Sequence, residues 1–167
     1  MGGSVPKALI SLADDEGNSV TVNVLGLVAW WPAGLDAEIV VRTPFVSGRI
    51  GLLLSASDLE HWADALDGLD GGEDIAWMEM SSGPSVFVQL SGERDCPEVV
   101  VEDESGSMVT VRVPLVPPDG WIADHRRRLR AVMDHWVLLL APWGAGAPGC
   151  HTATAAARRR AAERERR

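Results

Sequence analysis

The chain has 167 residues, 46 % of them hydrophobic, which is enough for one domain with its own core. Its two cysteines cannot form a disulfide framework, it has no run of 18 apolar residues, and its first residues lack the basic-then-apolar pattern of a signal peptide. We therefore expect a cytoplasmic protein without a membrane span, and the net charge of −9 argues against nucleic acid as a partner of the main body.

Alternating apolar and polar residues dominate the first part of the chain. In SVTVNV the valines fall at every second position, which is typical of a strand with one buried face. The segment DDEGN before it suits a turn, and WWPAGLD (residues 30–36) predicts a loop because Pro32 and Gly34 interrupt it. Strands are predicted at residues 7–13, 19–30, 37–43 and 45–54.

A helix is predicted over residues 57–69. Ser57 followed by Glu60 matches a capping box, in which the hydroxyl and the carboxylate each bond to a free backbone amide. Several glycines follow and predict the end of the helix. The apolar side chains recur at helical spacing and form one stripe, made of Leu59, Trp62, Ala63, Leu66 and Leu69.

The second half of the chain repeats the order of the first, with four strands followed by a helix. The segment ESGS (residues 104–107) predicts a hairpin turn between two of these strands. Strands are predicted at residues 74–80, 84–90, 98–104 and 108–115. A helix begins near Asp119, and its docking seam has spacings of three and four: Ile122, His125, Leu129, Val132 and Trp136.

These elements predict an α+β fold that is mainly antiparallel. About eight strands form a sandwich or a barrel-like pair of sheets, with two amphipathic helices packed on them. The short connections agree with antiparallel pairing. We expect one domain over residues 1–140, and then a flexible Ala-, Gly-, Pro- and Arg-rich linker and basic tail over residues 141–167.

Charge is distributed unevenly along the chain. The first 118 residues hold 19 acidic and five basic residues, whereas the tail from residue 137 holds six arginines and two glutamates. The run HRRRLR (residues 125–130) lies in a helix with a docking seam, so we expect its arginines to contact the acidic body or water. Nucleic acid stays open as a partner for the tail alone, although no aromatic residues are present there to stack on bases.

The sequence contains no recognisable catalytic or metal-binding motif. Cys96 and Cys150 have no Cys or His at zinc-finger spacing, and there is neither a G-x-S-x-G elbow nor a phosphate-binding glycine loop. Glu60, His61 and Asp64 share the polar side of the first helix, which we interpret as a solvated face. We therefore predict no catalytic residue, cofactor or metal, with an enzyme whose site is dispersed as an alternative.

Four segments carry a resemblance to a known family: LDAEIVV (35–41), SGRIGLLLSASDLEHWADALDGLDGGEDIAWME (47–79), VTVRVPL (109–115) and DGWIADHRRRLRAV (119–132). Over about residues 7–136 the chain resembles a small actinobacterial family of hypothetical proteins of unknown function. The order of strands, a DLxxWxxxLxxL helix and further strands is also similar to that of bacterial immunity proteins, which neutralise wall-associated polymorphic toxins. This second likeness is one of fold, and it implies a non-catalytic binding protein.

The acidic body and this resemblance predict a non-catalytic protein-binding module, immunity-like, whose acidic surface binds a basic protein partner. An alternative is an accessory or regulatory subunit that docks through its basic tail. The oligomeric state is not predicted. The candidate contact residues lie in two acidic turns and one tryptophan loop: Asp14, Asp15, Glu16, Trp30, Trp31, Glu102, Asp103 and Glu104.

Overall fold

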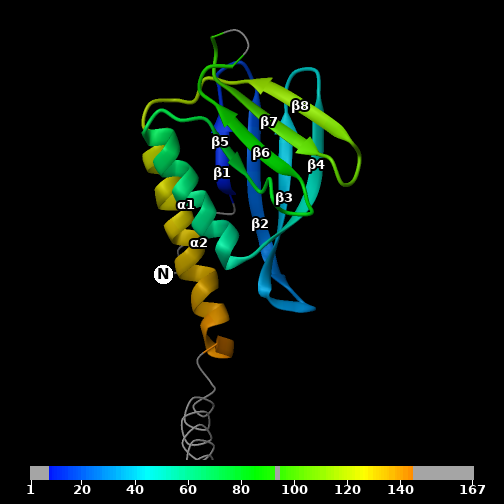
Figure 1. The fold of residues 1–167 in the computed structure, drawn as a ribbon, viewed down its shortest axis with the longest axis vertical. Helices are drawn as coiled ribbons and strands as arrows, with labels where there is room; N and C mark the ends of the chain where they lie inside the picture. Colours follow the sequence, from blue (N-terminus) through cyan, green and yellow to red (C-terminus); the bar gives the residue numbers. More distant parts are fainter. Residues whose placement is uncertain (1–7, 93–94, 145–167) are drawn as a thin grey trace, which may run out of the picture.

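The computed structural model describes residues 8–92 and 95–144. It confirms the predicted α+β class, because these residues form eight antiparallel strands in two four-stranded sheets, without a closed barrel, and two helices (Figure 1). In both sheets the strands lie in chain order. The elements are β1 (Ala8–Ala13), β2 (Ser19–Val28), β3 (Trp31–Arg42), β4 (Ser47–Leu54), α1 (Ala56–Asp70), β5 (Ile75–Trp77), β6 (Ser85–Gln89), β7 (Glu98–Asp103), β8 (Val109–Pro114) and α2 (Trp121–Gly144).

The alternation in the first half of the chain produces a sheet with one apolar face. Val22 of β2 pairs with Ile10 of β1 on one side and with Ile39 of β3 on the other, and all three side chains are fully buried. The next pair along, Asn23 and Glu38, points to the opposite face, where the two side chains form a hydrogen bond of 3.4 Å. The outer face of this sheet is therefore polar.

The second sheet follows the same rule. Val99 of β7 pairs with Val88 of β6 and with Val113 of β8, and these three side chains are also buried. The inner faces of both sheets belong to one hydrophobic core. The helices contribute to this core mainly through Trp62, Leu66, Leu129 and Val132.

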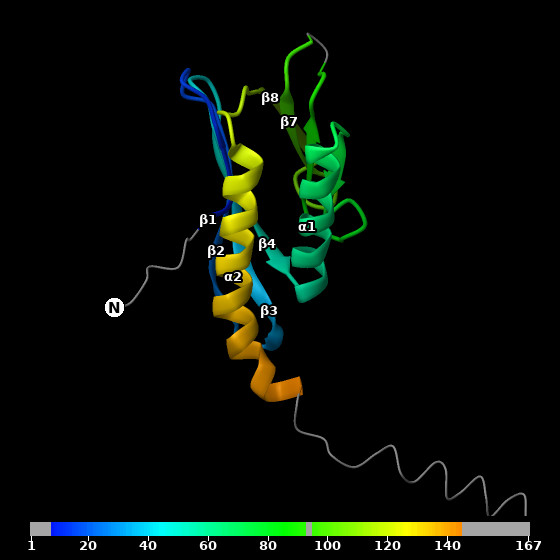
Figure 2. The same ribbon diagram turned by 90° about the vertical axis from the view of Figure 1, so that its left-hand side faces the viewer.

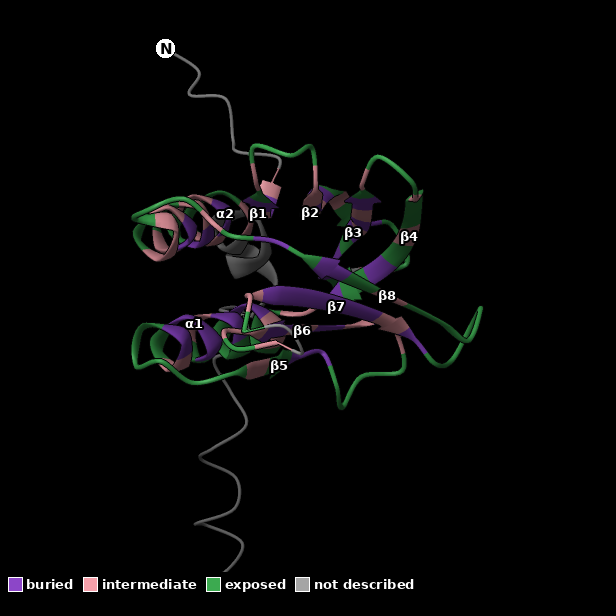
Figure 3. Ribbon diagram, turned by 90° about the horizontal axis from the view of Figure 1, so that it is seen from above, coloured by how far each residue is buried: buried purple, intermediate pink, exposed green. Residues whose placement is uncertain are grey.

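The two helices are exchanged between the halves of the chain. α1 follows β4 but lies beside β5 of the second sheet, whereas α2 follows β8 but lies beside β1 of the first. Seen from above, each layer is a sheet extended by the helix of the other half (Figure 3). Figure 2 shows the two helices side by side. The repetition of four strands and a helix is therefore a structural repeat with exchanged helices.

α1 begins at a different cap from the one predicted. Ser55 is the N-cap: its hydroxyl accepts from the backbone amide of Asp58, and the Asp58 carboxylate accepts from the amide of Ser55 at 2.7 Å. The predicted pair of Ser57 and Glu60 is wrong because the same spacing of a serine and an acidic residue occurs twice in SASDLE. Of the predicted apolar stripe, Ala63 is half-buried and the other four side chains are buried.

α2 provides hydrogen-bonding partners along the outer edge of β1. The backbone amide of Ser11 donates to Nε2 of His125 at 2.9 Å, so the proton of the neutral ring lies on Nδ1, which donates to the carbonyl of Trp121 at 2.7 Å. Arg128 donates to the carbonyl of Ala8 at 3.4 Å. His125 is 1 % exposed, and its burial lowers the pKa of the imidazole. The helix thus protects an edge strand that would otherwise be open.

β3 extends into a segment predicted to be a loop. It begins at Trp31, which pairs with Val28 across a two-residue turn. β4 ends opposite Leu35, so the first residues of β3 have no strand on that side. Pro32 is tolerated there because no ladder requires its missing amide.

Other boundaries also differ from the prediction. β5 is shorter than the strand predicted for residues 74–80. α2 continues to Gly144, past the predicted start of the linker at residue 141. The rest of the predicted tail, residues 145–167, lies outside the described residues. In the described segments, no helix has the combination of length and apolar character that crossing a membrane requires.

Candidate functional site

The first predicted acidic turn connects β1 to β2 and uses one carboxylate internally. Asp14 accepts hydrogen bonds from the backbone amides of Glu16 and Asn18, both at 2.9 Å, and from the Asn18 side chain at 2.8 Å. Partial burial raises the pKa of the Asp14 carboxyl, but these hydrogen bonds outweigh it and leave the pKa below its usual value. Asp15 and Glu16 are exposed, so the turn offers two carboxylates to a partner.

The second predicted acidic turn connects β7 to β8. Asp103 is 8 % exposed and accepts from the backbone amides of Ser107 at 2.6 Å and Gly106 at 3.1 Å. These hydrogen bonds, that from Ser107 above all, lower the pKa of the Asp103 carboxyl. Glu102 is half-buried and Glu104 is exposed. Asp103 therefore shapes the turn, and Glu104 is the carboxylate that the turn presents to solvent.

The predicted tryptophan pair lies in the β2–β3 hairpin. Trp30 is 75 % exposed and stacks on Trp31, with ring centroids 6.4 Å apart. Trp31 is half-buried, and its ring lies over Gly34, where any side chain would collide with it. Trp30 is thus accessible to a partner, whereas Trp31 stabilises the hairpin.

The structure does not bring these three segments together. The β1–β2 turn and the β2–β3 hairpin lie at opposite ends of β2, and the β7–β8 turn belongs to the other sheet (Figure 1). The β1–β2 turn instead borders a hollow of about 490 Å³ formed with Cys96 and with the connection from β8 to α2. The predicted residues therefore form three separate contact points and not one site.

A larger group of exposed carboxylates lies on α1 and on the segment that continues through β5. Residues 55–80 contain eight acidic residues and no Lys or Arg. β5 runs along α1, because Nε1 of Trp77 donates to the carbonyl of Asp58 at 2.9 Å and Gly68 leaves room for Ile75. We call the exposed carboxylates of this unit the acidic face: Glu60, Asp64, Asp67, Asp70, Glu73, Asp74 and Glu79.

One arginine of α2 contacts the acidic face. Arg126 donates to the carboxylates of Asp67 at 2.7 Å and Asp70 at 3.0 Å, which raises the pKa of its guanidinium. Both carboxylates lie near the C-terminus of α1, where the negative end of the helix dipole disfavours them, and Arg126 offsets this effect. The ion pairs found among the described residues do not include the rest of the acidic face.

A hollow of about 300 Å³ opens where the start of α1 meets the end of β5. His61, Glu79 and Met80 line it, and Met80 is 97 % exposed. Met78, also in the lining, has a positive φ of 67°, which is strained for a residue other than glycine. The hollow combines a carboxylate, an imidazole and an exposed apolar side chain at one end of the acidic face.

The chemistry that these surfaces offer is charge and apolar contact. Within residues 8–92 and 95–144, no group of three or more His, Cys, Asp or Glu side chains is placed to hold a metal ion. Sequence reasoning treated the polar side of α1 as solvated and so missed the acidic face. The signal that could have revealed it is the absence of Lys and Arg from residues 55–80.

Comparison with known families finds a match over most of the chain. A family of unknown function, DUF5959, matches residues 7–137. The chain belongs to this family. The matched DUF5959 segment contains both sheets, α1 and α2 as far as residue 137, and therefore every surface described above. No curated protein and no solved structure matches the chain.

Proposed function

We propose that this DUF5959 chain is a non-catalytic protein-binding module whose acidic face binds a basic surface of another protein. The observation that carries the proposal is the group of seven exposed carboxylates on α1 and on the residues that flank β5, in a segment without Lys or Arg. Such a surface accelerates association with a cationic partner through long-range attraction.

The charge pattern of α1 is unfavourable for the helix itself. Glu60 and Asp64 are four residues apart, so two like charges are neighbours on the helix surface, at a cost of about 0.2–0.5 kcal/mol. Asp67 and Asp70 lie close to the C-terminus of the helix, where negative charge is again disfavoured and has to be offset by Arg126 of α2. Interspersed charges of both signs would give solubility without this cost. The pattern therefore supports a role in binding.

The hollow beside Met80 gives the acidic face a place for a long cationic side chain. A partner's lysine or arginine can lay its alkyl stem along Met80 and bring its charge to the carboxylate of Glu79. A side chain held in this way is an anchor at one end of the contact. Trp30 and the exposed carboxylates of the two turns are secondary contact points.

A toxin with a basic active-site surface, such as a nuclease, is a partner of the right chemistry. Bound there, the acidic face would cover the cationic groups with which the toxin holds its substrate. The immunity-like interpretation of the sequence belongs to this proposal. The proposal predicts that the chain and its partner associate rapidly, and that their affinity falls as the salt concentration rises.

Two variants of equal charge change test the proposal. Each removes three exposed carboxylates. The acidic-face variant carries Glu60→Gln, Asp64→Asn and Glu79→Gln. The turn variant carries Asp15→Asn, Glu16→Gln and Glu104→Gln. The wild-type chain and both variants capture partners from an extract of the native host at low and high salt, and the Kd of the captured protein is then measured with purified components.

We expect the acidic-face variant to raise the Kd at least about tenfold at low salt, a loss of about 1.4 kcal/mol, while the turn variant binds like the wild-type chain. Loss of binding in the turn variant alone would move the site to the turns. Equal binding by all three chains, or no salt-sensitive partner, would reject the proposal. Deletion of residues 145–167 is expected to leave binding of the partner unchanged. The alternative function, docking through the basic tail, predicts that this deletion removes most of the binding.

A further inference from the structure

Each sheet has one edge that a helix covers and one edge that is open. α2 lies along β1 and α1 lies along β5. β4 and β8 end their sheets on the other side, and no further strand of the described chain pairs with them. Figures 1 and 3 place β4 and β8 next to each other, on the side of the molecule away from both helices.

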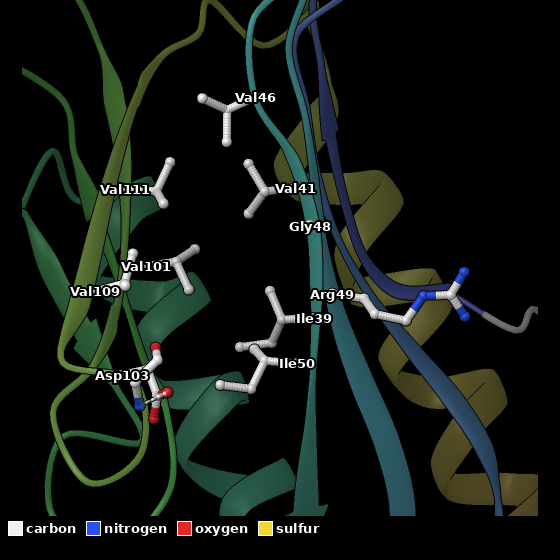
Figure 4. A pocket seen from close by; sticks show the side chains of 11 residues that line it. Ile39, Val41, Val46, Gly48, Arg49, Ile50, Val101, Asp103, Val109 and Val111 are labelled. Carbon is white, nitrogen blue, oxygen red and sulfur yellow. Dashed lines mark hydrogen bonds between the residues drawn. The ribbon is translucent and has the colours of Figure 1, made fainter.

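Between these two strands the sheets leave an open apolar groove of about 330 Å³. Gly48 widens it, because Gly48 faces inward beside Val41, and a side chain there would meet no atom within 4 Å. Figure 4 shows the aliphatic side chains of the two walls facing each other: Ile39, Val41 and Ile50 from the first sheet, and Val101, Val109 and Val111 from the second.

The groove presents almost no charge to an occupant. The side chain of Arg49 points away from the groove in Figure 4. Its Nη1 lies 3.7 Å from Oε2 of Glu38 on the outer face of the sheet. Asp103 lies at one end of the groove, but its carboxylate accepts hydrogen bonds from the backbone amides of Gly106 and Ser107. An occupant is therefore held by apolar contacts, in contrast to a partner of the acidic face.

Two large apolar side chains project near the ends of the groove. Phe45, in the β3–β4 turn, is 96 % exposed and precedes Val46, which lines one end. Met108, in the β7–β8 turn, is 84 % exposed, and its amide donates to the carbonyl of Asp103 at 2.8 Å. Figure 4 shows Val46 and Asp103 at opposite ends of the groove. Phe45 adjoins the lining residue Val46 along the chain, and Met108 adjoins Ser107 and Val109, which also line the groove. Exposed apolar side chains thus flank an apolar groove, a combination that marks an interaction site.

We propose that this groove is the interface of a homodimer, in which a second copy of the chain docks through the same surface. A two-fold interface has to be self-complementary, because both copies present the same residues. This surface meets the requirement, since it contains both a recess and the side chains that can fill one. With the two-fold axis perpendicular to the groove, Phe45 of each copy lies over the Met108 end of the other.

The charge distribution favours this surface over the acidic face as the place where two copies meet. The net charge of −9 makes two copies repel each other wherever their acidic surfaces meet. The groove lies on the side away from α1, so pairing through it keeps the two acidic faces at the far ends of the dimer (Figure 3). The open edges of β4 and β8 add backbone groups that can pair with those of the second copy.

Sedimentation of the full chain tests the proposal at about 1–100 µM, a range that detects a Kd near 1 µM. Phe45→Ser removes a projecting side chain, and Gly48→Leu fills the recess. Gly51→Leu is the matched control, because Gly51 lies in the same strand with equally open space but faces outward beside Glu38. Melting temperatures verify that each variant is folded.

We expect the wild-type chain and Gly51→Leu to dimerise with the same Kd, and Phe45→Ser and Gly48→Leu each to raise it at least about tenfold. High salt preserves or strengthens the dimer, because it screens the repulsion between acidic copies. High salt instead weakens the binding of a basic partner to the acidic face. The salt dependence therefore distinguishes failure of the homodimer proposal from failure of the proposed function. A chain that stays monomeric throughout, or a dimer that Phe45→Ser and Gly48→Leu leave intact, would overturn the homodimer.

Discussion

His125 of α2 is one of the residues that connect the two halves of the chain. Its ring packs edge-on against Trp62 of α1, with centroids 6.2 Å apart, and against Trp121 of its own helix at 5.5 Å. Nε2 accepts the amide of Ser11 from β1. A protonated ring could not accept this hydrogen bond, and its charge would be buried near the guanidinium of Arg128. The neutral form is therefore part of the folded structure.

We predict that the chain loses stability as the pH falls below about 6.5, the usual pKa of histidine. Because burial lowers the pKa of His125 in the folded chain, the unfolded chain takes up a proton there that the folded chain does not. The free energy of unfolding then falls by up to about 1.4 kcal/mol per pH unit. Urea denaturation at a series of pH values measures this slope.

Two variants separate this effect from other titrations. His125→Gln removes the buried ring and is expected to flatten the slope, whereas His61→Gln, at an exposed position on α1, is expected to keep it. Asp14 and Asp103 have lowered pKa values, so the stability they contribute is present above their usual pKa of 3.8 and is lost only at lower pH. A constant free energy of unfolding between neutral pH and about pH 5 would contradict the role given to His125.

Asp14 and Asp103 also explain why the candidate site could be predicted only in part. Both stand in runs of acidic residues that suggest exposed charge, yet each carboxylate accepts hydrogen bonds from backbone amides of its own turn. These hydrogen bonds depend on the path of the backbone through the turn, which residue types alone do not specify. Their neighbours Asp15 and Glu104 have the exposure that the sequence leads one to expect.

At the scale of elements, the local patterns predicted most of the fold. All eight strands and both helices occur in the predicted order, because period-2 and helical spacings are properties of short segments. What the patterns could not predict is which element covers which edge. The contact of Ser11 with His125 joins residues 114 positions apart, and no local spacing encodes it.

The start of α1 provides a test at this scale. Replacing Ser55 by Ala removes the hydroxyl that caps the helix and is expected to cost about 1 kcal/mol of stability. Replacing Ser57, the cap that the sequence predicted, is expected to change stability by less than about 0.5 kcal/mol. Urea denaturation of the two variants compares them directly. A larger loss from Ser57→Ala than from Ser55→Ala would contradict the observed cap.

The acidic face likewise depends on how two elements, α1 and β5, pack against each other. Taken alone, the polar side of α1 has the pattern of any solvated helix face. The hydrogen bond from Trp77 to the carbonyl of Asp58 places β5 along the helix and adds Glu79 and the hollow beside Met80 to its surface. The extent of this surface depends on packing that the sequence does not display.

At the scale of the whole molecule, the exchange of helices couples the two sheets. Neither half can unfold alone without exposing the apolar side of a helix that belongs to the other half. We therefore predict a single cooperative unfolding transition, with equal calorimetric and van't Hoff enthalpies. In the variant Leu129→Ala, whose substitution lies in α2, hydrogen exchange is expected to accelerate in both sheets. Two separate calorimetric transitions would contradict this coupling.

The exchange also determines when the molecule can fold during its synthesis. The ribosome makes β1 well before α2, which covers the edge of β1. At about 5–20 residues per second, the interval between them is on the order of ten seconds. Throughout that time the nascent chain carries an unprotected strand edge that α2 has not yet covered, so chaperones have an extended window in which to act.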